Sequence, residues 1–459
     1  MTSSTSRRAF LKRSAALSMA GVAAPWALNL AALGEAAAAT ASDYKALVCV
    51  FLYGGNDYGN TLIPYDDTRY AAYQGMRPTL AYAKSALAAT LLAPTVALDG
   101  GIQYALAPEL APLLPLFTAG QLGVMLNIGT LVAPITKAQY VAGSAALPPR
   151  LFSHNDQQSV WQSSSPEGAT SGWGGRIGDL FEAGNGNATF TCINVSNNAV
   201  FMSGHATTQY QVSTSGPVAL TGVKSPLFGS SACSTALRAL VTGASTNPLE
   251  NEYARISNRS LSAGDTLTAA LAAGPTLKTP FPTPGQNGLA DQLKLVARMI
   301  ATAGAVGAKR QVFFVSAGGF DNHDGLATVH PKLLTNVAQA LSAFQGACVE
   351  LGVANEVTTF TASEFGRTLT ANDGSDHGWG SMHFVMGGAV HGGRYYGTPP
   401  VVANNGPDDV GQGRLLPSTS VDQLAATLGR WFGVSDSDLL TVLPNLPNWS
   451  VGQRNLGFV

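Results

Sequence analysis

The chain has 459 residues, of which 46% are hydrophobic and only 12% are charged, and its formal net charge is −1. This length accommodates one large α/β domain or two smaller ones, and the hydrophobic fraction is ample for a buried core. The near-neutral charge, without a basic or acidic block, excludes an electrostatic surface for nucleic acid or for an anionic membrane. We therefore expect no nucleic-acid partner.

The N-terminus carries a predicted export signal. Residues 6–12 read Ser-Arg-Arg-Ala-Phe-Leu-Lys, the twin-arginine consensus, and an apolar, alanine-rich stretch at about 15–33 precedes a small-residue cleavage site at 37–39. A membrane anchor is the alternative, because the apolar stretch approaches spanning length. Moderate hydrophobicity and Pro25 favour a signal peptide over residues 1–39. This predicts a periplasmic or secreted protein, the twin-arginine translocase as its partner during export, and no stable membrane span in the mature chain.

The first half of the mature chain contains two predicted buried strands. Residues 46–53 form a near-continuous apolar run that ends at Gly54 and Gly55, which is typical of a strand buried on both faces. Residues 108–117 predict a short helix, and residues 123–128 predict the second strand. The stretch at about 185–245 is rich in Asn, Ser, Thr and Gly, and we expect it to be an irregular, β-containing insertion.

The second half alternates helical and strand patterns. Helical spacing covers 249–272, 288–307, 331–351, a segment capped by Ser420 that runs to Phe432, and 435–443; strand patterns cover 311–317, 356–361 and 382–386. This alternation predicts a three-layer α/β sandwich around a mostly parallel central sheet, in a single domain over residues 40–459.

The four cysteines do not indicate a thiolate metal site. Cys49 and Cys348 lie inside a predicted strand and a predicted helix, so we expect both in the core. Cys192 and Cys233 have the option of a disulfide outside the cytoplasm, although their spacing does not require one. No Cys-x-x-Cys occurs, so zinc bound by thiolates is not expected.

Polar runs follow two of the predicted strands. Asp57 comes after the first strand, where Gly54 and Gly55 allow a tight turn, so its carboxylate is a candidate metal ligand. The alternative is an ordinary turn, which the run Gly-Gly-Asn-Asp also favours. Asp321 and His323 follow the strand at 311–317. In an extended loop, positions i and i+2 project to the same side, so we expect both side chains to bind one ion.

A third strand is followed by further candidates. We expect Glu364 to bridge two ions or to bind a second ion. The planar guanidinium of Arg367 suits a phosphoryl or sulfuryl oxygen, and an internal pair with Glu364 is the alternative. His377 is expected to complete the coordination sphere, with Asp376 binding directly or orienting it.

Hydrolysis at such a site needs a nucleophile, which is either a water activated by the metal or an activated side chain. Ser153 and His154 stand at a predicted helix N-terminus, where backbone N–H groups favour an anion. Ser153 is therefore a candidate nucleophile, and a plain N-cap is its alternative. Thr61 is either a cap or a hydroxyl that faces the site. His383 begins an apolar run, so it lies either near the site or in the core.

Six motifs together carry a resemblance to a known family: GGND at 54, SHNDQQ at 153, GWGGR at 172, GGFDNHDG at 318, SEFGRT at 363 and DHGWG at 376. The pattern resembles the DUF1501 family of exported bacterial proteins without an assigned activity. That family is similar in fold to the alkaline phosphatase and sulfatase superfamily. The resemblance implies a mostly parallel sheet with helices on both faces and a crevice for two metals.

The resemblance also implies ligands, by motif: Asp57, Asp321, His323, Glu364 and His377. Two departures stand out, one from the phosphatase pattern and one from the sulfatase pattern. The pair Glu364-Phe365 replaces Asp-His, which removes one imidazole, and the sulfatase signature Cys-x-Pro-x-Arg is absent from the sequence. The remaining polar candidates are expected behind the ligands or against the substrate: Asn56, His154, Asp376 and His383.

These observations predict an exported metal-dependent hydrolase of phosphate or sulfate esters, with one or two divalent ions. Asp, Glu and His suit zinc, calcium, magnesium or manganese. Arg367 would hold a non-bridging ester oxygen. A serine esterase of the SGNH type is disfavoured, because no Gly-Asp-Ser follows the first strand and no Asp-x-x-His stands near the C-terminus. The alternative is a relative that has lost catalysis and serves as an exported binding or assembly protein.

Overall fold

The structure is a computed structural model that describes residues 41–401 and 403–459. The predicted twin-arginine signal at 1–39 lies outside the described residues. Among the helices that are described, none has the length and apolar character needed to cross a membrane.

A ten-stranded sheet runs through the molecule in the order β11–β4–β10–β9–β1–β8–β5–β6–β7, and β12 pairs with β4. Its strands are β1 (Lys45–Leu52), β4 (Leu122–Gly129), β5 (Cys192–Asn194), β6 (Tyr210–Ser213), β7 (Gly216–Pro217), β8 (Arg310–Ala317), β9 (Val357–Ala362), β10 (Ser381–Met386), β11 (Tyr395–Tyr396) and β12 (Thr419–Ser420). The central strand β1 is parallel to β8 and β9, whereas β10 is antiparallel to β9 and β4. The predicted mixed, mostly parallel sheet is confirmed.

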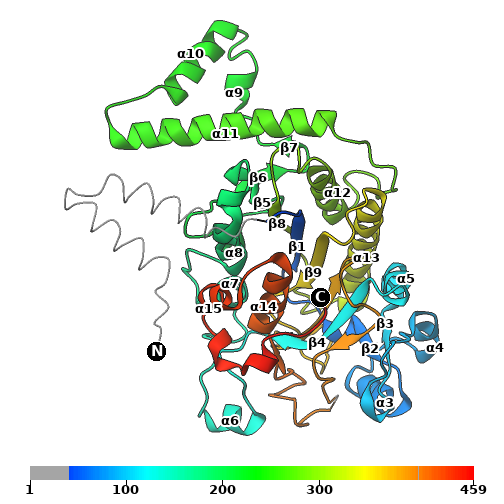
Figure 1. Cartoon of the computed structure of the whole chain (residues 1–459). Helices are drawn as coiled ribbons and strands as arrows, with labels where there is room; N and C mark the ends of the chain where they lie inside the picture. The colour runs from blue at the N-terminus through cyan, green and yellow to red at the C-terminus, as the bar shows by residue number, and fades with distance from the viewer. Residues whose placement is uncertain (1–40, 402) are drawn as a thin grey trace.

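Successive residues of β1 show why helices cover both faces of the sheet. Ala46, Val48 and Val50 belong to one core cluster, which also contains residues of α12 (Gly288–Ala301) and α13 (Leu326–Glu350). The intervening Leu47, Cys49 and Phe51 belong to a second cluster with α8 (Trp173–Phe181), α14 (Val421–Phe432) and α15 (Asp436–Val442). Figure 1 shows these two helical layers on opposite sides of the sheet. The architecture is therefore a three-layer α/β sandwich.

The remaining elements lie around this sandwich. They are β2 (Leu62–Pro64) and β3 (Tyr104–Leu106), which form a separate antiparallel pair, and the helices α3 (Asp67–Met76), α4 (Lys84–Leu87), α5 (Leu114–Thr118), α6 (Lys137–Ala142), α7 (His154–Ser163), α9 (Thr221–Lys224), α10 (Ser231–Thr242) and α11 (Pro248–Ala273).

Some segments differ from the sequence-based expectation. The helix expected at 108–117 is a 3-10 segment, Pro108–Leu113, followed by the short α5, because Pro112 and Pro115 lack the N–H that a continuous α-helix needs. Within 185–245, β5 and β6 extend the central sheet, so this stretch is not wholly an insertion. Strands of three and four residues are too short to give a periodic signal.

The four cysteines are all free thiols in the structure, so the optional disulfide between Cys192 and Cys233 is not formed. Cys192 is buried in the core, and Cys233 is exposed on α10.

Candidate metal centre

The candidate site lies where several chain segments meet at one edge of the sheet. Because β1, β8 and β9 are parallel, the loops that follow them meet at the same edge. These loops carry Gly54, Asp321 with His323, and Glu364 with Arg367. The strand β10 begins at this edge because it is antiparallel to β9, and His377 lies just before it. The helix α7 adds His154 as its first residue.

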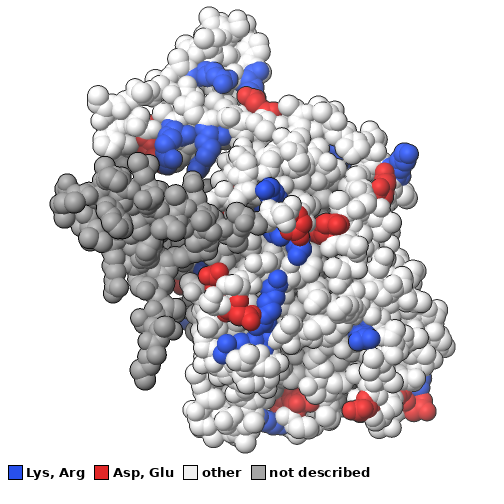
Figure 2. All heavy atoms as spheres, in the orientation of Figure 1, with Lys and Arg blue, Asp and Glu red and all other residues white. Residues whose placement is uncertain are grey.

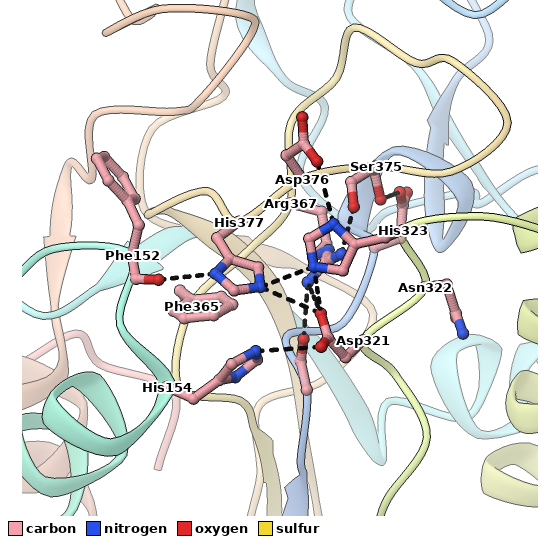
Figure 3. Close-up of polar contacts among 12 residues, drawn as sticks. Phe152, His154, Asp321, Asn322, His323, Phe365, Arg367, Ser375, Asp376 and His377 are labelled. Carbon is pink, nitrogen blue, oxygen red and sulfur yellow. Dashed lines mark hydrogen bonds and ion pairs between the residues drawn. The ribbon is translucent and has the colours of Figure 1, made fainter.

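Three imidazole Nε2 atoms surround the carboxylate of Asp321 (Figure 3). His323 Nε2 lies 2.9 Å from Asp321 Oδ1, and His377 Nε2 lies 3.1 Å from the same oxygen. His154 Nε2 lies 3.4 Å from Oδ2. The Nε2 atoms of His323 and His377 are themselves 3.0 Å apart. The structure thus brings together Asp321, His323 and His377, as predicted, and adds His154 to the cluster.

The other nitrogen of each ring is held by an oxygen. Nδ1 of His154 lies 2.7 Å from Glu364 Oε1, and Nδ1 of His323 lies 3.1 Å from Asp376 Oδ1. Nδ1 of His377 donates to the backbone carbonyl of Phe152 over 2.7 Å. A carbonyl can only accept, so the neutral His377 ring carries its hydrogen on Nδ1 and presents an Nε2 lone pair to the cluster. This is the arrangement that metal-binding histidines adopt.

The donor set fits one divalent ion. In a tetrahedral zinc site, two ligand atoms lie about 3.3 Å from each other. The distances from Asp321 oxygens to the three Nε2 atoms, and between the Nε2 atoms of His323 and His377, are close to this value. Ligand atoms of His154, Asp321 and His377 all lie within 4.8 Å of one another. The buried Nε2 of His154 also has no hydrogen-bond partner among the described residues. Imidazole nitrogens together with a carboxylate oxygen favour zinc or another first-row metal over calcium or magnesium.

Glu364 lies behind His154 and is placed differently from the sequence expectation of a metal ligand. Its Oε1 accepts hydrogen bonds from the backbone N–H of Gly54 over 2.9 Å and from Gln158 over 3.2 Å, in addition to the contact with His154. The side chain is fully buried. Glu364 Oε1 therefore orients the imidazole of His154, whereas the buried Oε2 has no hydrogen-bond partner among the described residues.

Arg367 also has a role other than the predicted one. Its fully buried guanidinium donates to Asp321 Oδ1 over 2.7 Å, to the carbonyl of Gly54 over 3.0 Å and to the carbonyl of Ser375. These contacts engage both terminal nitrogens of the guanidinium, and the buried Nε has no partner among the described residues. Arg367 therefore fixes Asp321, and the expectation that it holds the ester is not supported.

The surroundings favour the metal-binding forms of Asp321 and His377 but stabilise the protonated form of His154. Burial opposes ionisation of Asp321, but the hydrogen bond and charge of Arg367, with the nearby His154 and His323, lower its pKa to about 2. The hydrogen bond to Glu364 raises the pKa of His154 despite partial burial. Burial lowers the pKa of His377; the hydrogen bond to the Phe152 carbonyl opposes this effect, and the charges of His154 and Arg367 add to it. Asp321 is thus a carboxylate, and His377 is a neutral base, near neutral pH.

Asp57 lies in a separate buried network, which corrects its predicted role as a ligand. Its two oxygens accept a bidentate pair from Arg77, with distances of 2.7 and 2.5 Å, and one of them also accepts from Ser375 Oγ over 2.7 Å. Asn56 and Thr61 are buried beside it and bond to each other, and Thr61 Oγ1 donates to the Asp57 carbonyl. Because its carboxylate is engaged in this way, Asp57 has a structural role. Asn56 and Thr61 bond within the same network and not to the cluster.

Two more candidates are placed away from the ion position. Ser153 occupies the N-cap position of α7, but its hydroxyl donates to Asp156 over 2.8 Å and makes no capping bond. It is therefore not poised as a nucleophile. His383 is buried in β10, where burial lowers its pKa to about 3, and its ring lies 3.4 Å from Thr361 Oγ1. Asp376 orients a histidine as expected, although that histidine is His323 rather than His377.

Sequence reasoning missed four contributors to the site. Gln158 bonds to Glu364, the Phe152 carbonyl holds His377, and the ring of Phe365 stacks on His377 with 4.8 Å between centroids. Arg77 neutralises Asp57. The spacing of Gln158 from His154, one helical turn along α7, was the one available signal. A backbone carbonyl such as that of Phe152 leaves no signal in a sequence.

Comparisons with known proteins give a family and distant structural relatives. No curated protein matches the chain. Among solved structures, the chain is similar to Ps i-CgsB in complex with k-i-k-neocarrahexaose, with 10% identity over 90% of this chain and 77% of that one and a TM-score of 0.36. The sulfatase PsFucS1 from Pseudoalteromonas sp. has 11% identity over 89% and 71%, with a TM-score of 0.34. A variant of the alkaline phosphatase PafA has 10% identity over 71% and 64%, with a TM-score of 0.27.

These likenesses are too distant to carry an argument about activity. The family match is of a different kind, because it extends over residues 44–443, nearly all of the part of the chain that the structure describes. The chain therefore belongs to the family described as protein of unknown function, DUF1501.

Proposed function

We propose that this chain is an exported, metal-dependent hydrolase of phosphate or sulfate esters that uses a single divalent ion, with zinc as the best fit. One observation carries the proposal: three imidazoles present their Nε2 atoms to the carboxylate of Asp321 while each Nδ1 is held from behind. Such convergence has no role in packing. An ion bound there would act as a Lewis acid and lower the pKa of a coordinated water.

The cluster is open to solvent, and neighbouring residues hold its side chains in place. Side chains of Asp321 and His323 are 43% and 47% exposed, so a substrate can reach the cluster from solvent. Arg367 keeps Asp321 ionised, and Glu364 and Asp376 hold two of the rings. Because the Ser153 hydroxyl is engaged by Asp156, we propose water as the nucleophile.

A hollow of about 250 Å³ lies next to Gln158 of α7, and we propose that it receives the rest of the substrate, although none of the four donor residues lines it. Gln158 links the hollow to the cluster, because it lines the hollow and also bonds to Glu364. The lining is polar but almost uncharged, with no Lys or Arg among its residues: Tyr53, Asn155, Gln158, Ser159, Gln162, Glu167, Gly168, Ala169, Asn198, Ala199 and Val200. This composition favours an uncharged hydroxyl-bearing or amide-bearing group over a second anionic group.

The proposal is tested by metal analysis and a substrate panel. We expect one divalent ion per purified chain, measured by inductively coupled plasma mass spectrometry. We also expect turnover of at least one substrate among an aryl phosphate monoester, a bis-aryl phosphate diester and an aryl sulfate. A chain without a bound ion would refute the metal centre. A chain that is fully loaded yet turns over none of the three would instead favour the exported binding protein.

Glu364→Gln tests whether Glu364 acts through His154. We expect metal affinity to fall by about 10–100-fold, the usual cost of losing the partner that orients a ligating histidine. The fold should persist, because the shape of the side chain is retained. Competition with a chelator measures the affinity. Glu167→Gln is the matched control, because Glu167 is exposed and lines only the hollow; an equal loss in both variants would contradict the assigned role.

A further inference from the structure

A helical arm formed by α9, α10 and α11 projects from the sandwich (Figure 1), and several large apolar side chains of residues 218–256 are exposed. Soluble proteins rarely gather large exposed apolar side chains in one place unless the surface binds something. Here half of all the exposed large hydrophobic residues that the structure describes fall between residues 218 and 256: Val218, Leu220, Phe228, Leu240, Leu249, Tyr253 and Ile256.

The helix α11 is anchored by only part of its length. Ala263, Leu267 and Ala270, in its C-terminal half, belong to the main core cluster. In the N-terminal half, Leu249, Tyr253 and Ile256 are 82%, 60% and 46% exposed. Their spacing of i, i+4 and i+7 places them in one stripe along the helix. The buried positions Ala254, Ser257 and Leu261 occupy a different face, so this apolar stripe has no partner among the described residues.

Two charged residues beside the stripe, Glu252 and Arg259, could form ion pairs with the same residues of a second chain. Glu252 and Arg259 are seven residues apart, so they lie on one flank of the stripe, two turns from each other. Glu252 accepts from Arg255 over 2.6 Å, whereas Arg259 makes no ion pair with any residue in the described ranges. When two such helices pack antiparallel about a two-fold axis, Glu252 of each faces Arg259 of the other. The flank is therefore self-complementary.

A lipid surface is a poorer fit for the arm. Helices that lie on membranes carry a polar face rich in Lys and Arg. The arm mixes both signs, as the blue and red groups at the top of Figure 2 show. Its cations Lys224, Arg238, Arg255 and Arg259 are nearly balanced by Glu250, Glu252 and Asp265.

We propose that the stripe of Leu249, Tyr253 and Ile256 binds a second copy of this chain, with the two α11 helices antiparallel and Glu252 paired with Arg259 across the two-fold axis. The surface lies on the arm and contains no residue of the metal centre. The proposal therefore stands or falls independently of the hydrolase.

Sedimentation velocity of the purified chain over a wide concentration range tests this. We expect a monomer–dimer equilibrium, and Tyr253→Asp with Ile256→Asp should raise the dissociation constant by more than about 100-fold. Val141→Asp, at an exposed apolar position on α6, is the control and should leave the equilibrium unchanged. A chain that is monomeric at every concentration, or a dimer indifferent to the double substitution, would overturn the proposal.

Reversing the charge of Glu252 or Arg259 by substitution gives a second test that leaves the apolar contacts unchanged. Glu252→Arg or Arg259→Glu alone should raise the dissociation constant by about tenfold, because like charges then face each other. The two substitutions in one chain should restore the dimer, since the opposite signs are again paired across the axis. Failure of the combined variant to recover would refute the antiparallel register. Far-UV circular dichroism checks that each variant is folded.

Discussion

Asp321→Asn is expected to abolish stoichiometric metal binding and the ester hydrolysis proposed for this site. The carboxylate lies within 3.4 Å of the Nε2 atoms of His154, His323 and His377, so it is the donor that all three imidazoles share. The loss of affinity should exceed the roughly 10–100-fold cost of removing an outer hydrogen-bond partner. Metal analysis and turnover on the responsive substrate provide the measurements.

The choice of asparagine matters for interpreting this variant. Asparagine retains an oxygen that can accept the hydrogen bond from Arg367, so the buried guanidinium keeps a partner. Asp324→Asn is the matched control, because Asp324 is an exposed carboxylate three residues away in the same loop. Full metal content in Asp321→Asn would refute the centre, and an equal loss in both variants would point to damage of the loop.

The sequence predicted the sheet because its central strands are long and continuously apolar. β1, β8 and β9 are buried over most of their length, and such runs are the strongest signal of a parallel strand. The loops after these strands were therefore predicted to share one edge, and Asp321 and His323 do lie at that edge. The short strands β5 and β6 gave no comparable pattern.

The roles of individual carboxylates could not be predicted in the same way. Asp57 and Asp321 both follow buried strands, so the sequence offered the same argument for each as a ligand. What separates them is the position of arginines distant in sequence: Arg77 engages both oxygens of Asp57, whereas Arg367 engages one oxygen of Asp321. His154 was predicted to lie behind the ligands or against the substrate, not to be a donor itself, because its helix starts far along the chain from Asp321, His323 and His377.

Asp57→Ala is expected to destabilise the protein severely and to leave the metal centre intact. The pair of Asp57 and Arg77 is almost completely buried, with side-chain exposures of 1% and 0%. Removing one partner leaves an unpaired buried charge, which costs about 3–5 kcal/mol in the free energy of unfolding. Urea denaturation measures this cost, and metal content is measured under folding conditions. Asp57→Ala combined with Arg77→Met should cost less than Asp57→Ala alone, because no unpaired charge then remains.

The pH dependence of stability gives an independent signature of the same pair. Burial opposes ionisation of Asp57, but the charge and hydrogen bonds of Arg77 prevail and hold its pKa well below the usual range. A carboxyl with a depressed folded-state pKa contributes stability above its unfolded pKa of about 4, and this contribution is lost as the pH falls below that value. Asp57→Asn should therefore reduce the loss of stability at acid pH.

If Asp57→Ala instead lost the ion without losing stability, Asp57 would be a ligand after all, because a structural carboxylate cannot produce that combination.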